Sequence, residues 1–137
     1  MNNFIKISEE NRVGDTYINK NKIKIITEKK NVGCEIFLFA EKHTHTISIE
    51  DSFEVLKQQL PNFLEVALLD KKKKQVKALI NLDNILSLVG GKNGVIFRTR
   101  ILFFKKIYSG VFSEESLAEI MLKVQAIEER CSNDKIT

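Results

Sequence analysis

Two stretches of this chain match each other position for position, and this internal match constrains the fold more than any other feature of the sequence. Residues 17–26 (YINKNKIKII) align with residues 79–88 (LINLDNILSL) at an offset of 62. Residues 3–7 (NFIKI) align with residues 62–66 (NFLEV) at an offset of 59. Blocks that match in the same order predict an internal duplication. The alternative is that any two units of short strands and one helix share such patterns.

A third matching block closes each half, where the period of the apolar residues changes to that of a helix. The apolar residues stand three and four apart at an offset of 64: Phe53, Leu56, Leu60 and Leu117, Ile120, Val124. For the first helix we expect Asp51 as the N-cap, Glu54 reaching back to it, and Pro61 as the residue that stops it.

The second helix is predicted to be longer than the first. We expect it to run from Ser113 to about Arg130, with Ser113–Glu115 as its cap and acidic residues in its first turn. Met121 and Ile127 extend its apolar face. The polar residues 131–137 are expected to form a flexible tail.

Short strands and turns fill the rest of each half. In the first half we predict strands at 3–7, 16–18, 23–25, 34–40 and 44–49, with a bend at 19–22 and turns at 9–15 and 29–33. In the second half we predict strands at 62–66, 85–89, 95–104 and 107–111, with turns at 70–74 and 90–94. Residues 34–40 are apolar on both faces of a strand, which favours a central place in a sheet.

The predicted fold class is therefore α+β: two pseudo-repeated antiparallel β-meanders, each closed by one C-terminal helix and packed together. The repeats are assigned to residues 1–60 and 61–130, followed by the tail at 131–137. A unit of about 60 residues buries too little apolar surface to be stable alone. We therefore expect the two units to share a core, with helix against helix or sheet against sheet.

Composition and charge restrict the function classes. Apolar residues make up 43% of the chain without a run long enough to span a membrane, and the N-terminus lacks the layout of a signal peptide. Cys34 and Cys131 stand far apart, so free thiols in a reducing, cytoplasmic setting are expected. The net charge of +4 falls entirely in residues 61–137. This bias permits contact with an anionic partner.

Several of these segments resemble a known family. Ile18-Asn19 with Ile23, Ile80-Asn81 with Ile85, and the helix starts at 50–54 and 114–117 resemble the FlbD-like family of bacterial flagellar and swarming genes. That family has the order strand, Ile-Asn-x-x-x-Ile, strand, turn, strand, short helix. The resemblance covers most of each half and implies a tandem of such units, and it carries no catalytic residues.

A weaker resemblance is to LytTR-type DNA-binding domains. Residues 52–63 (SFEVLKQQLPNF) followed by 79–85 (LINLDNI) are similar to that family's passage from helix to strand. The family's basic segment after the Phe is replaced here by residues 64–68 (LEVAL), and about eight extra residues intervene. The part that contacts DNA in that family is the part that does not match.

Basic residues of the second half are the candidate binding site. Arg98 and Arg100 alternate on one face of a predicted strand, and a run of four lysines occupies a predicted turn. Together they form a basic surface that can hold phosphate, or else a solvated strand face and loop. The candidate nucleic-acid or anion-binding residues are Arg98, Arg100, Lys105, Lys106, Lys71, Lys72, Lys73, Lys74 and Lys92.

Other chemistry finds little support in the sequence. His43 and His45 alternate as a two-histidine metal site would, with only Glu41 near them, so exposed histidines at a turn are the simpler interpretation and no metal is predicted. The glycines at 90–94 lead into a strand and not a helix, so a hairpin is favoured over a phosphate loop. Glu114 and Glu115 are interpreted as capping or solvated charge.

Three hypotheses for function remain open. The first is a non-enzymatic interaction or assembly protein, bacterial or from a phage, that forms a homo-oligomer through its sheets and acts in the cytoplasm of a cell or a phage-infected host, or in a virion. The second is a nucleic-acid-binding regulatory module that uses the basic residues above. The third is a protein that sequesters a small anionic ligand between its halves. No cofactor and no membrane partner are expected.

Overall fold

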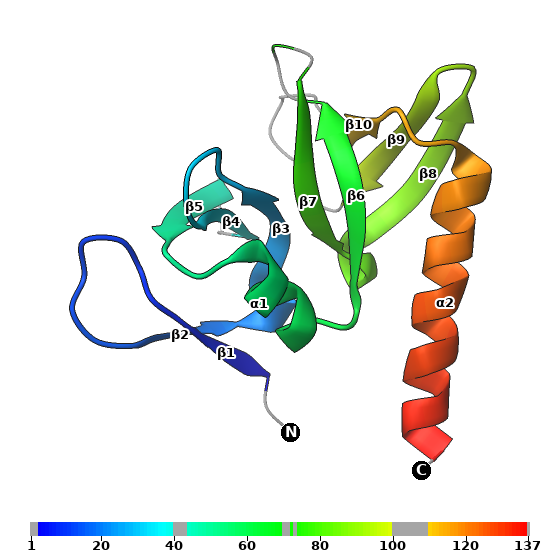
Figure 1. Ribbon diagram of the computed structural model, residues 1–137. Coiled ribbons are helices and arrows are strands. Elements are labelled where there is room, and N and C mark those ends of the chain that lie inside the picture. Colours follow the sequence, from blue (N-terminus) through cyan, green and yellow to red (C-terminus); the bar gives the residue numbers. More distant parts are fainter. Residues whose placement is uncertain (1–2, 40–43, 70–71, 73, 100–109, 137) are drawn as a thin grey trace.

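The computed structural model describes residues 3–39, 44–69, 72, 74–99 and 110–136, and the α+β class predicted from the sequence is confirmed (Figure 1). The first half contains β1 (Phe4–Ile7), β2 (Thr16–Asn19), the 3₁₀ helix η1 (Lys20–Lys22), β3 (Ile23–Glu28), β4 (Cys34–Phe39), β5 (Thr44–Ile49) and α1 (Phe53–Gln59). The second half contains β6 (Phe63–Leu69), β7 (Gln75–Asn81), η2 (Leu82–Asn84), β8 (Ile85–Gly91), β9 (Gly94–Thr99), β10 (Gly110–Ser113) and α2 (Leu117–Ile136).

One antiparallel sheet runs through both halves. Its strand order is β5-β4-β3-β7-β6-β10-β9-β8, and β1 and β2 form a separate two-stranded sheet. The halves meet edge to edge where β3 pairs with β7, with Ile26 opposite Leu79. As predicted, β4 lies inside the sheet, between β5 and β3. Residues 100–109, which include much of two predicted strands, lie outside the described part of the chain.

The two halves agree in element order and in strand register. Both contain a hairpin whose register shifts at its start, between Ile23 and Ile25 in β3 and between Ile85 and Ser87 in β8. These positions are related by the offset of 62 found in the sequence. The agreement supports the predicted repeat, while its origin by duplication stays a prediction.

The bends after β2 and β7 also have the same construction. Asn19 caps η1 by accepting a hydrogen bond from the Asn21 N–H at 3.0 Å, and Asn81 caps η2 by accepting one from the Asp83 N–H at 3.1 Å. An asparagine side chain favours this local turn because its oxygen replaces a missing backbone acceptor. The Asn-x-x-x-Ile pattern of the sequence is therefore an N-cap followed by a 3₁₀ turn.

The expectation of one shared core is wrong, because each half has its own. The first core contains Ile5, Ile7, Ile18, Ile23, Ile26, Cys34, Ile36, Ile49, Phe53, Leu56, Leu60, Phe63 and Leu79. The second contains Ile25, Leu64, Val66, Leu68, Ala78, Ile80, Val95, Phe97, Ile120, Val124 and Ile127. Each core takes residues from the other half, since side chains alternate along the joined strands. The halves are therefore joined through a strand pair, and a helix covers each core separately.

The helix boundaries differ from the prediction at their N-terminal ends. The N-cap of α1 is Ser52, which accepts a hydrogen bond from the Val55 N–H at 3.2 Å, and not Asp51. The start of α2 has Ser116 in this role, since its Oγ accepts from the Glu119 N–H at 3.2 Å. Ser113 belongs to β10 instead of capping the helix.

The C-terminal ends can also be compared with the prediction. α1 ends before Pro61 as predicted, and α2 continues to Ile136, so that it includes most of the segment predicted as a tail. Met121 lies outside the buried face of α2, with 37% of its surface exposed. Neither helix, over the residues that the structure describes, combines the length and apolar character needed to cross a membrane.

Candidate functional site

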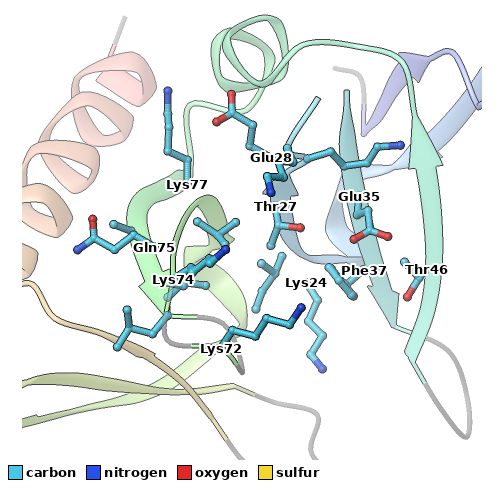
Figure 2. Close-up of a pocket in the computed structure, with 17 residues that line it drawn as sticks. Lys24, Thr27, Glu28, Glu35, Phe37, Thr46, Lys72, Lys74, Gln75 and Lys77 are labelled. Atoms are coloured by element: carbon cyan, nitrogen blue, oxygen red, sulfur yellow. The ribbon is translucent and has the colours of Figure 1, made fainter. Parts of the chain in front are cut away.

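A cleft of about 1390 Å³ lies along the line where the two halves join. Residues of β3, β4, β5, β6 and β7 line it, together with residues on either side of the β3–β4 and β6–β7 turns. In Figure 2 the side chains from β4 and β5 lie on one side and those from β7 on the other, with Lys24 and Thr27 of β3 between them. The cleft therefore exists only because β3 pairs with β7.

On β4, the alternation of strand residues explains which side chains reach the cleft. Cys34 and Ile36 are buried in the first core, whereas Glu35 and Phe37 point the other way and line the cleft. On β7, the three consecutive residues 75–77 all line the cleft, so both faces of that strand contribute. The cleft is thus lined by the face of β4 opposite the first core and by both faces of β7.

Positive charge dominates the lining of the cleft. Among the described residues, six lysines line it, Lys24, Lys29, Lys30, Lys72, Lys74 and Lys77, against two acidic residues, Glu28 and Glu35. Cations gathered around one concave surface raise the local concentration of anions. This excess equals the net charge of the whole chain, +4.

Several of these lysines have partners that fix their place. Lys77 lies 3.4 Å from a carboxylate oxygen of Glu54 and 5.0 Å from the centre of the Phe53 ring, so it links β7 to α1. Lys29 forms an ion pair with Glu10. Burial lowers the pKa of Lys24 from its ordinary value, because the charged ammonium is partly removed from water.

The structure brings together only part of the basic surface predicted from the sequence. Lys72 and Lys74 line the cleft. Lys92 lies at the β8–β9 turn, exposed and away from the cleft lining. Arg98 belongs to β9, and its side chain lies outside what the structure describes. The remaining predicted residues, Lys71, Lys73, Arg100, Lys105 and Lys106, lie outside the described part of the chain.

Four lysines of the cleft were not predicted as site residues. Lys24 is a polar position of a predicted strand, and Lys29 and Lys30 belong to a predicted turn. Lys77 falls in no predicted element, because β7 was not predicted from the sequence. These lysines come together only through the pairing of β3 with β7, which joins strands of different halves. The duplication gave no direct hint of this pairing, because β3 and β7 are not equivalent strands: the offset of 62 relates β3 to β8 and β2 to β7.

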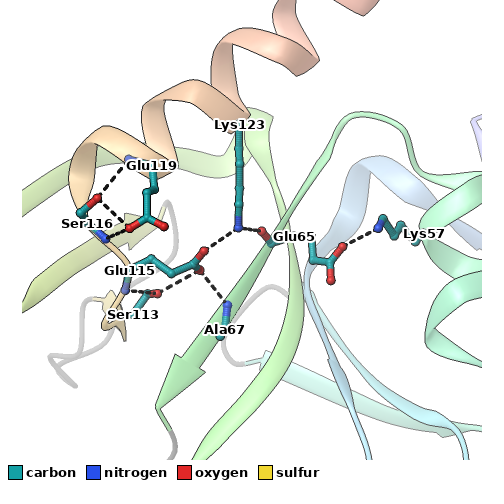
Figure 3. Close-up of polar contacts among 8 residues, drawn as sticks. All are labelled: Lys57, Glu65, Ala67, Ser113, Glu115, Ser116, Glu119 and Lys123. Atoms are coloured by element: carbon teal, nitrogen blue, oxygen red, sulfur yellow. Dashed lines mark hydrogen bonds and ion pairs between the residues drawn. The ribbon is translucent and has the colours of Figure 1, made fainter.

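A second cluster of polar side chains, shown in Figure 3, lies where β10 leads into α2. The Glu115 carboxylate accepts hydrogen bonds from the Ala67 N–H at 3.0 Å, from the Ser113 hydroxyl at 3.2 Å and from Lys123 at 2.5 Å. Lys123 also donates to the Glu65 carbonyl of β6 at 3.0 Å. The interpretation of Glu115 as capping or solvated charge is therefore wrong: it holds α2 and β10 against β6.

The glycine segment forms a hairpin, as predicted. Gly90 and Gly91 end β8, and Gly94 begins β9 with a φ of 147°, in the region that favours glycine. A Cβ at Gly94 would lie 2.1 Å from the Ser113 carbonyl oxygen. The glycine therefore permits β9 to approach β10 closely, and this close approach accounts for its place in the hairpin.

The predicted histidine pair cannot be assessed as a pair, because His43 lies outside the described residues. His45 lies in β5 and is exposed. Within residues 3–39, 44–69, 72, 74–99 and 110–136, no group of three or more His, Cys, Asp or Glu side chains could hold a metal ion. Comparisons with known protein families, with curated proteins and with solved structures found no match to this chain.

Proposed function

We propose that this chain is a non-enzymatic binding protein that holds single-stranded nucleic acid in the cleft between its halves. The observation that carries the proposal is the lysine excess around the cleft, where the described part of the lining has six cations and two acidic residues. Lysine contacts phosphate as a point charge, so such a cleft would bind the backbone without reading a sequence.

The shape of the cleft favours an extended ligand over a small anion. Its volume of about 1390 Å³ exceeds the range of about 300–1,000 Å³ that is usual for small-molecule pockets. Among the described residues, every buried side-chain nitrogen and oxygen already has a hydrogen-bond partner. No buried polar side chain in that part of the chain therefore needs a ligand to complete its hydrogen bonds.

Phe37 gives the cleft an aromatic surface. It is half-buried in β4, where it packs against the second core, and it lines the cleft together with Lys24 and Thr27. Single-stranded nucleic acid is commonly bound by a basic groove that follows the backbone and by aromatic rings on which bases stack. A duplex keeps its bases stacked inside and would leave Phe37 without a base to contact.

The test is fluorescence anisotropy with a labelled single-stranded oligonucleotide of mixed sequence, repeated over a range of salt concentrations. Binding should weaken with salt, and each lysine that contacts a phosphate should contribute about 0.7 to the slope of log affinity against log salt. We expect Lys72→Gln and Lys74→Gln together to lower this slope. Lys92→Gln removes the same charge outside the cleft and serves as the matched control.

Three results would overturn the proposal. The first is no binding at low salt, and the second is an equal loss of affinity in the Lys92→Gln control. The third is a small anion that native mass spectrometry finds bound to the purified chain but not to the Lys74→Gln variant. That result would favour the sequestering function instead. Tighter binding of duplex than of single strands would remove the role given to Phe37.

A further inference from the structure

Two strands, β3 and β7, join the halves by pairing along one edge of each. The strands equivalent to them, β8 and β2, have no partner on the corresponding edge within the described part of the chain. At the junction β3 pairs with β7, with Ile25 opposite Ile80, Ile26 opposite Leu79 and Thr27 opposite Ala78. The offset of 62 relates β3 to β8 and β2 to β7. The second half thus contains a copy of the β3 edge, and the first half contains a copy of the β7 edge.

Within the described part of the chain, neither copy has the partner that its counterpart has. β8 stands at the end of the eight-stranded sheet and pairs only with β9, and β2 pairs only with β1. Figure 1 shows the β1–β2 sheet and β8 on opposite sides of the molecule. An edge strand presents unpaired N–H and C=O groups, which form a template for another strand.

Burial differs sharply between the junction residues and their counterparts. Leu79 is fully buried, whereas Tyr17, at the equivalent position of β2, is 62% exposed. The same holds for the neighbouring strands, where Phe63 is 7% exposed and its counterpart Phe4 is 51% exposed. Large apolar or aromatic side chains that are exposed next to an open strand edge mark an interaction surface.

The other side of the junction shows the same difference. Ile26 of β3 is fully buried, whereas its counterpart Leu88 in β8 is only partly buried. The extension of α2, which reaches the second core through Ile127, covers part of that core. Even so, Leu88 keeps solvent exposure along β8.

We propose that the partner for both edges is a second copy of this chain, with β8 of one copy pairing antiparallel with β2 of the next. By the register of the junction, Leu88 would lie opposite the next copy's Tyr17, with Val89 opposite Thr16 and Ser87 opposite Ile18. This is strand addition at a sheet edge, in which the main chain supplies affinity and the side chains supply register. The internal β3–β7 pair shows that strands of these types associate in this way.

The geometry of such a contact determines the kind of assembly. The two surfaces are different and lie on opposite sides of the chain, so each copy would present one of them to each neighbour. A contact between unlike surfaces produces a ring when its rotation closes and an open filament when it does not. A two-fold dimer is therefore not the expected product.

The test combines sedimentation velocity of the full chain, from micromolar to millimolar concentration, with two blocking variants. We expect the mass to increase with concentration beyond that of a dimer. Tyr17→Lys puts a charge on the β2 surface, and Val89→Lys puts one on the β8 edge. Since charged residues oppose edge pairing, each should weaken association at least about tenfold on its own.

Mixing the two variants gives the decisive measurement. The Tyr17→Lys chain keeps its β8 edge and the Val89→Lys chain keeps its β2 edge, so the mixture should form a heterodimer and nothing larger. Val13→Lys adds the same charge on a fully exposed residue of the β1–β2 loop and should leave association unchanged. Circular dichroism checks that all three variants remain folded. If Tyr17→Lys unfolds, Tyr17→Glu replaces it, since it also adds a charge and its carboxylate would lie opposite Lys6 of β1.

Four results would overturn the proposal. They are a monomer at every concentration, a wild-type dimer that does not grow further, a variant mixture that stays monomeric, and an equal loss of association in Val13→Lys. Self-association and oligonucleotide binding use different residues, so Tyr17→Lys should retain binding in the cleft. Failure of one proposal is thereby distinguished from failure of the other.

Discussion

The Glu115 carboxylate accepts a hydrogen bond from the Ala67 N–H, next to the single residue pair that joins β6 to β10. The first half contains the same contact, in which Asp51 accepts from the Ser8 N–H at 2.7 Å. The two donors are related by the offset of 59, and the two carboxylates by the offset of 64. A carboxylate just before the helix thus holds the first strand of each half where the strand ladder ends.

The Glu115 contact predicts a pH-dependent contribution to stability. Partial burial alone would raise the pKa of Glu115, but hydrogen bonds from Lys123, Ala67 and Ser113 outweigh it and lower the pKa below its ordinary 4.5. A lowered pKa in the folded state means stabilisation that is present above pH 4.5 and lost as the pH falls through the lowered value. We expect Glu115→Gln to lower the free energy of unfolding by about 1–2 kcal/mol at neutral pH.

Urea unfolding at several pH values measures this effect. The difference between Glu115→Gln and the unsubstituted chain should shrink as the carboxyl becomes protonated. Glu128→Gln removes an exposed carboxylate of α2 and should change stability little. If the difference in free energy of unfolding stayed constant down to acid pH, the effect of Glu115→Gln would come from packing and not from charge.

Two glycines at equivalent hairpins, Gly33 and Gly94, should be equally intolerant of a side chain, so that alanine at either position destabilises the fold. Gly33 has a φ of 92° and Gly94 a φ of 147°, and a Cβ at either would lie 2.1 Å from a carbonyl oxygen of the adjoining strand. We expect Gly33→Ala and Gly94→Ala each to destabilise the fold by about 2 kcal/mol or more. In Gly91→Ala the nearest atom is 3.9 Å away, so its midpoint of thermal unfolding should stay close to that of the unsubstituted chain. A tolerated Gly33→Ala would argue against this close approach of β4 to β5.

Most local features of the fold were predictable from the sequence. The bend after β2, the hairpin at Gly94 and the buried helix face of Phe53 and Leu56 all follow from patterns spanning fewer than about ten residues. β7 and the bend after it were not predicted. The helix caps were misplaced because Asp51 and Ser52 are both good N-cap residues and stand side by side. Only the structure shows that one caps the helix while the other binds a strand.

The cleft was not predictable in the same way. Its formation depends on β3 meeting β7, and no local pattern indicates which strand edges of two units will pair. Lys24 and Lys77 come from strands of different halves, so no window of sequence contains both. Of the predicted basic residues, Lys72 and Lys74 line the cleft, because they lie in the turn that leads into β7. That they bind an anion stays a prediction.

The two cysteines should differ in reactivity. Burial, with the negative charges of Glu28 and Asp51, raises the pKa of the Cys34 thiol to about 11, so little thiolate forms at neutral pH. Cys131 is only partly buried. We expect iodoacetamide to label Cys131 in the folded chain and to label Cys34 only after unfolding in urea, as read by peptide mass spectrometry. Fast labelling of Cys34 in the folded chain would show that the first core opens readily.

A comparison of Asn81 with Asn19 measures what side-chain hydrogen bonds contribute to the junction between the halves. Both cap a 3₁₀ turn, but Asn81 is 2% exposed and its side-chain amide also donates to the Ile23 carbonyl of the other half at 3.0 Å. Asn84 donates to the same oxygen at 3.1 Å. Among the described residues, Asn19 makes no such bond between halves.

Asn19→Ala should therefore lower the free energy of unfolding by about 1 kcal/mol, the usual effect of a lost cap. Asn81→Ala loses the cap and also leaves the Ile23 carbonyl with one donor fewer in a buried place, so we expect a loss of about 2–3 kcal/mol. Replacing Asn84 as well should increase the loss beyond the sum of the single changes, because the two amides share an acceptor. Urea unfolding at a concentration where the chain is monomeric gives all three values. Equal losses for Asn19→Ala and Asn81→Ala would mean that the strand pair alone, without these amides, holds the halves together.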